Sequence, residues 1–111
     1  MMYQQAKHDR RADEVRIRVE LLTAYETLSR AVDEARALRD EVLPRASTVY
    51  EALNEGYRRG KFRLLDLLEA RRTLAHTRLR YVDALVRLSI ADADLRRFIS
   101  DDSLADDGAQ R

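Results

Sequence analysis

Apolar residues recur at steps of three and four residues along most of this chain, and this spacing restricts the fold more than any other feature. The first series consists of Val15, Val19, Leu22, Tyr25, Leu28, Val32, Ala35, Leu38, Val42, Ala46, Val49 and Leu53. Such a period places apolar side chains along one face of an α-helix. Roughly 49 residues at about 1.5 Å each predict a rod on the order of 70 Å long, far longer than a compact domain requires.

The first series ends at Gly56-Tyr57-Arg58-Arg59-Gly60-Lys61, where Gly60 can adopt the left-handed conformation that closes a helix. The cationic side chains beside it suit the negative end of a helix. A second helical series follows, with Leu64, Leu67, Leu68, Leu74, Ala75, Val82, Leu85, Leu88, Ile90, Leu95, Phe98 and Ile99. The sequence therefore predicts an all-α fold, a long antiparallel two-helix coiled-coil hairpin.

The predicted hairpin covers residues 11–99, with helices at about 10–58 and 63–99 and a turn at about 59–62. Pro44 lies inside the first series, and because the apolar period keeps its phase on both sides, we expect a kink there and not a helix end. Residues 1–10 are polar and predict a flexible N-terminus, while residues 100–111 are acidic and turn-rich and predict a disordered tail.

The composition argues against several classes of function. Lys plus Arg number 21 and Asp plus Glu number 20, a net charge of +1, so no overall basic field favours nucleic acid. There is no cysteine, and His8 and His76 lie far apart without carboxylates at ligand spacing, so we expect no metal site. The sequence shows no nucleophile-base pair, phosphate loop or cofactor fingerprint, and it predicts neither an enzyme nor a cofactor.

Neither a secretory signal nor a run of 18 apolar residues is present, so the chain as given is expected to be soluble. A hairpin of two helices cannot cover its own apolar surface on every side. We therefore expect it to associate with further helices, either in copies of itself or in a larger protein.

The start of the second helix combines apolar and acidic residues. In residues 64–70 four leucines occupy an arc roughly 160° wide, and Asp66 and Glu69 lie opposite. Carboxylates in a first helical turn are favoured by the helix dipole alone, by roughly 0.3 to 1 kcal/mol each. Periodicity by itself thus favours a structural interpretation of the two acids.

The sequence around the turn resembles that of a known protein family. Tyr57-x-x-Gly60 followed by Asp66-Leu67-Leu68-Glu69-Ala70-Arg71-Arg72 resembles the periplasmic tip of TolC-like outer membrane efflux proteins, and Leu43-Pro44-Arg45-Ala46 and Tyr81-x-x-Ala84-Leu85 extend the likeness over about residues 11–100. The resemblance implies part of a periplasmic α-barrel of twelve helices, built by a trimer and continuous with an outer-membrane β-barrel, which would be the chain's only association with the membrane. It implies a transport component of the periplasm and outer membrane, partnered by a periplasmic adaptor protein and an inner-membrane efflux pump.

The resemblance also assigns roles to individual residues. It places Asp66 and Glu69 in acidic rings around the closed aperture, and it places Tyr57 and Phe62 at the same gate. Phe62 stands where some members have a gate-locking arginine. The edge that would dock the adaptor consists of Arg59, Gly60, Lys61 and Arg63, the last replacing a Ser or Thr able to cap the helix.

Two questions stay open at the level of sequence. A free hairpin that self-associates or binds partner helices, as a structural or protein-interaction module, is the alternative to an efflux duct. These residues do not identify the cargo, although the Leu-Pro-x-Ala and Asp-Leu-Leu-Glu-Ala segments favour the heavy-metal-efflux branch of the family.

Overall fold

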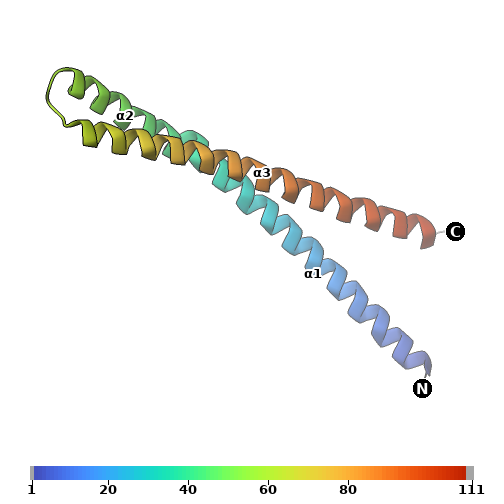
Figure 1. Ribbon diagram of the computed structural model, residues 1–111. Helices are drawn as coiled ribbons and strands as arrows, with labels where there is room; N and C mark the ends of the chain where they lie inside the picture. Colours follow the sequence, from blue (N-terminus) through green and yellow to red (C-terminus); the bar gives the residue numbers. More distant parts are fainter. Residues whose placement is uncertain (1, 110–111) are drawn as a thin grey trace. The chain divides into compact units, whose positions relative to one another are not determined.

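The protein is helical throughout the part that the structure describes. The computed structural model gives the backbone of residues 2–109 and the side chains of residues 9–101. Its elements are α1 (Met2–Ala37), the π-helical turn η1 (Leu38–Val42), α2 (Leu43–Arg58) and α3 (Leu64–Ala109) (Figure 1). The predicted all-α class is confirmed. None of these helices is long and apolar enough to span a bilayer.

Both ends of the helices extend past their predicted limits near residues 10 and 99. Neither proline nor glycine occurs in residues 2–9 or in residues 100–107, so these segments lack the residues that most often interrupt a helix. Flexibility of the two ends stays a prediction. Residues 1, 110 and 111, which belong to those predicted ends, lie outside the described residues.

One compact unit comprises residues 31–89, which include the turn and the adjoining parts of both arms of the predicted antiparallel hairpin. In Figure 1, α2 and the first part of α3 lie side by side. The core consists of Ala35, Leu38 and Ala84, against which Tyr81 and Leu88 pack. Because two of the three buried residues are alanines, the helices can approach closely at this point.

Within residues 64–89 of α3, the buried and half-buried residues other than Asp66 follow a strict heptad spacing. They are Leu67, Ala70, Leu74, Thr77, Tyr81, Ala84 and Leu88, all buried or half-buried, and we call them the hairpin seam. Larger and smaller side chains alternate along the seam, which lets facing layers interdigitate. Between the arms, the Arg87 guanidinium lies 3.3 Å from the Glu34 carboxylate, and within α3 it lies 2.9 Å from the Asp83 carboxylate.

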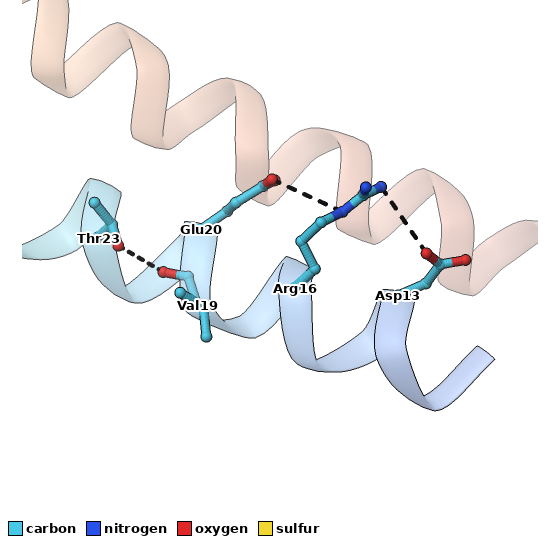
Figure 2. Close-up of polar contacts among 5 residues, drawn as sticks. All are labelled: Asp13, Arg16, Val19, Glu20 and Thr23. Carbon is cyan, nitrogen blue, oxygen red and sulfur yellow. Dashed lines mark hydrogen bonds and ion pairs between the residues drawn. The ribbon is translucent and has the colours of Figure 1, made fainter. Parts of the chain in front are cut away.

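The second compact unit comprises residues 1–30 together with residues 90–111. Its two segments line a groove of about 310 Å³, to which Val19, Thr23, Ala91 and Phe98 contribute. Figure 2 shows the charged surface of α1 in this unit, where Arg16 lies 4.0 Å from the carboxylates of both Asp13 and Glu20. The Thr23 hydroxyl donates to the Val19 carbonyl at 2.8 Å.

These α1 ion pairs are exposed on both partners, so each contributes at most about 1 kcal/mol to stability.

The chain near Pro44 differs from the sequence-based expectation. The Leu43 N–H donates to the Leu38 carbonyl five residues back, so η1 holds one more residue than an α-helical turn. In an α-helix Pro44 would leave the Asp40 carbonyl without a donor and its ring would collide with that carbonyl, and the wider turn relieves this conflict.

The extra residue changes the phase of the apolar stripe, so the prediction of an unchanged phase is wrong. Val42 and Val49 were expected to face α3, yet they are 37% and 53% exposed. Leu43 and Tyr50, each one residue later, are half-buried in their place.

Candidate functional site at the hairpin tip

The turn between the arms is a Schellman motif at the end of α2. The Gly60 N–H donates to the Tyr57 carbonyl at 3.0 Å, and the Lys61 N–H donates to the Gly56 carbonyl at 2.8 Å. Gly60 has φ 75°, the left-handed conformation that this pair of hydrogen bonds requires. The turn thus satisfies carbonyls that the end of a helix would otherwise leave unpaired.

Phe62 closes the turn by packing against the last part of α2. Gly56 is buried, and a Cβ added there would overlap the Phe62 ring. The ring is still 45% exposed, because its other face lies open to solvent. Gly56 therefore gives room to an aromatic side chain, whereas Gly60 supplies a backbone conformation.

Asp66 secures the start of α3. Its carboxylate accepts a hydrogen bond from the Arg63 backbone N–H at 3.3 Å, and the Arg63 carbonyl accepts from the Asp66 N–H at 3.1 Å. This contact is the second half of a capping box, in which the acid three residues into the helix reaches back to the cap residue. The missing Ser or Thr at position 63 is thus partly compensated by Asp66.

A groove of about 640 Å³ lies between α2 and the first turns of α3. Its lining residues are Val42, Arg45, Ala46, Val49, Leu53, Phe62, Asp66, Glu69, Ala70, Thr73 and Thr77. We call it the tip groove. Its α2 wall is mainly aliphatic, and its α3 wall carries the two carboxylates and two threonines. Arg45 is the cationic side chain among these lining residues, so the formal charge of the lining is one negative unit.

The tip groove contains further polar groups that the sequence did not single out. Thr77 is buried, and its hydroxyl donates to the Thr73 carbonyl at 2.8 Å. Thr77 occupies a hairpin-seam position, so the heptad spacing could have placed it toward α2. Arg45 and Val49 reach the groove because η1 turns α2, which the sequence alone does not reveal.

A sequence profile of the outer membrane efflux proteins matches residues 2–100. The chain belongs to the outer membrane efflux protein family. It is 38% identical over 74 residues to a protein of Cupriavidus metallidurans named cobalt-zinc-cadmium resistance protein CzcC. The match covers 67% of this chain but spans 18% of CzcC. No solved structure matches the chain significantly.

The resemblance to TolC-like proteins that the tip motif indicated is therefore confirmed, and outer membrane efflux proteins are transport components. In this family member, the structure brings three of the four predicted gate residues together, because Phe62, Asp66 and Glu69 all line the tip groove. Tyr57, the fourth, is exposed and is not among the lining residues. Asp66 is half-buried and Glu69 is exposed.

The four residues predicted to dock an adaptor form the turn of this efflux-protein hairpin. Arg59, Gly60, Lys61 and Arg63 are all exposed. The Arg59 guanidinium lies 3.1 Å from the Glu55 carboxylate, while neither Lys61 nor Arg63 forms an ion pair with any side chain in the described region. The turn thus presents at least two uncompensated cations.

Elsewhere in the hairpin of this efflux-family chain, η1 carries a charge pair. The Arg39 guanidinium donates to both carboxylate oxygens of Asp40, at 2.8 and 3.2 Å, and this hydrogen-bonded contact lowers the pKa of Asp40 below 3.8. Within residues 9–101 no three His, Cys, Asp or Glu side chains gather into a group able to hold a metal ion.

Proposed function

We propose that this hairpin forms part of the wall and the inner end of a trimeric efflux duct, with Asp66 and Glu69 narrowing the aperture. The observation that carries the proposal is the tip groove, where both carboxylates and Phe62 share one surface immediately beyond the turn. Around a threefold axis, three copies of each acid would form two rings of like charge. Their repulsion would make the closed aperture easy to open, and the rings would favour cations.

A second apolar series on α3 supports assembly into a ring of helices. Leu65, Leu68, Ala75, Leu79, Val82 and Val86 also follow heptad spacing, interrupted by Arg72, and all are exposed. We call them the outer seam. It precedes the hairpin seam by two heptad positions, which places the two seams about 154° apart around the helix.

This angle matches the geometry of a closed ring. A helix in a ring of twelve contacts its two neighbours at about 150°, the interior angle of a twelve-sided polygon, which lies close to the angle between the seams. A helix buried against one neighbour needs one apolar seam, whereas α3 has two. The outer seam therefore supports the packing of α3 between two neighbouring helices of a closed ring.

The cationic turn supports docking to a periplasmic adaptor, which in turn would connect the duct to an inner-membrane pump. Lys61 and Arg63 present exposed positive charge beside the rigid Schellman turn. An acidic surface on the adaptor would be attracted to this edge, and the attraction would weaken with added salt.

The relation to CzcC suggests the cargo. That protein is named for resistance to cobalt, zinc and cadmium. Two carboxylates on the tip groove suit divalent cations better than anions, since a converging ring of negative charge favours cation entry. We propose divalent metal cations as the cargo of the duct.

The gate is tested by cation block of single channels, recorded in planar bilayers with a full-length outer membrane efflux protein that carries this hairpin. The paired variant Asp66→Asn with Glu69→Gln removes the charge of both rings while keeping side chains of similar size. We expect the multivalent-cation concentration for half-block to rise about tenfold or more, because the attraction of the rings is lost.

Asp83→Asn is the matched control, since Asp83 is also an exposed α3 carboxylate but pairs with Arg87 away from the tip groove. It should leave block unchanged. Equal block in the parent and the paired variant would show that these carboxylates do not line the aperture.

The alternative, a self-associating structural or interaction module, is favoured by the same outer seam. Sedimentation of the 111-residue chain should show concentration-dependent association under both functions. The two differ in conduction, because a module without a pore gives no channels whose block depends on Asp66 and Glu69.

A further inference from the structure

The π-helical turn η1 separates two overlapping sets of apolar residues on α2. If the helix were α-helical throughout, the step from Leu38 would lead to Val42, Ala46, Val49 and Leu53. With one extra residue in η1, each position of this set moves on by one, to Leu43, Ser47, Tyr50 and Asn54, all of which are half-buried. Ala46 and Leu53 border this second face and are half-buried as well.

The structure uses the second set. Leu43 and Tyr50 are half-buried, while Val42 and Val49 are more exposed and line the tip groove. The first set is apolar at all four positions, whereas the second includes Ser47 and Asn54, so the first set can also pack on the hairpin seam. A helix with a single apolar face would have one favoured orientation, and α2 has two.

We propose that η1 is a two-register device that sets the rotation of α2 about its own axis. In the register seen here, the Leu43 N–H bonds to Leu38 and the extra residue is held in η1. Conversion of η1 to an α-helix moves this hydrogen bond to the Arg39 carbonyl and rotates α2 by about 100°, the angle of one residue. Val42 and Val49 then pack on α3 in place of Leu43 and Tyr50.

Pro44 favours the register seen here. It cannot donate to the Asp40 carbonyl as an α-helix would require, and its ring excludes that carbonyl from the α-helical position. The packing of Phe62 on Gly56 also belongs to this register, because Gly56 moves away when α2 rotates. The alternative register is therefore a minor state whose population rises when Pro44 is replaced.

The rotation also changes the tip groove, which goes beyond the gate proposed above. Val42 and Val49 line the same groove as Asp66 and Glu69. In the alternative register they leave the groove for the hairpin seam, so the aliphatic lining of the tip groove changes without any movement of α3.

Single-cysteine labelling tests the device, because the chain has no native cysteine. Val49→Cys and Tyr50→Cys are each placed in the full chain, and the rate of modification by a thiol reagent is measured. With Pro44 present, the thiol introduced at position 49 should react several-fold faster than the one at position 50. Adding Pro44→Ala should reverse this order. An unchanged order in a Pro44→Ala protein of normal helicity would overturn the proposal.

A deletion pair keeps the test decisive if Pro44→Ala weakens folding. Deleting Glu41 together with Pro44→Ala removes the extra residue, which leaves an uninterrupted α-helix with Leu43 and Tyr50 facing α3. This variant should melt at or above the temperature of the parent and should protect a thiol at position 50.

The matched control deletes Arg78, also exposed and charged, in the same Pro44→Ala background. Arg78 lies in α3, where no π-helical turn is present to absorb the change of phase, so this deletion should lower the melting temperature strongly. If both deletions lowered the melting temperature equally, η1 would hold no removable residue and the proposal would fail.

Discussion

Replacing Gly60 with alanine tests whether the left-handed turn determines how the hairpin closes. At φ 75° an alanine Cβ is strained against its own backbone, which costs roughly 1–2 kcal/mol. No other atom lies within 4 Å of a Cβ built at this position, so no packing clash adds to that cost. We expect Gly60→Ala to lower the free energy of unfolding by about 1 kcal/mol, or the melting temperature by about 4 °C.

The loss is measured by urea unfolding followed by far-ultraviolet circular dichroism. All variants are compared at one protein concentration, because association through the outer seam would make stability depend on concentration. Gly60→Asn is the control, since asparagine adopts the left-handed conformation more readily than alanine, and it should lose about half as much. If alanine were as stable as glycine, with the same dependence on urea, the Schellman turn would not limit the stability of the tip.

Three further predictions follow from the packing and charges of residues 31–89. Leu38→Ala should destabilise the hairpin by about 2–5 kcal/mol in thermal unfolding because Leu38 is 3% exposed. Gly56 and Phe62 are tested by a double-mutant cycle of unfolding free energies. In the Phe62→Ala background, where the ring is gone, Gly56→Ala should stabilise the chain by about 0.5–1 kcal/mol, and with Phe62 present it should stabilise the chain by less. Asp40 should stabilise the fold above its ordinary pKa of 3.8, an effect lost as pH falls through the lowered folded-state pKa, so any stability difference from Asp40→Asn should vanish in acid.

The hairpin and its turn were predictable because their determinants are local. A left-handed glycine after a long apolar period fixes where one helix stops, and Gly60 needed no distant contact to be identified. The family likewise followed from a short ordered motif around that turn. The acids of the first α3 turns were also found by sequence, although the hydrogen bond from Asp66 back to Arg63 was not.

The facing residues were harder to predict because the chain carries more apolar residues than one seam needs. The second predicted series combined hairpin-seam residues such as Leu74 with outer-seam residues such as Val82, which lie on different faces of α3. On the first arm, the period gave no sign that Pro44 would be accommodated by an extra residue in η1. Periodicity locates a helix, but it does not decide between two apolar faces when both are present.

Asp66 and Glu69 share the tip groove, yet they are not equivalent members of the proposed gate. The Asp66 carboxylate already accepts the Arg63 backbone N–H, whereas no side chain or backbone donor within the described residues holds Glu69. A cation bound at Asp66 would compete with a hydrogen bond that stabilises the start of α3, while a cation at Glu69 would meet no such competition. Neutralising the gate at Asp66 therefore changes both the charge of the aperture and the anchoring of the helix beside it. In the proposed gate, cation binding at Asp66 would therefore be coupled to the conformation of the tip through this one carboxylate.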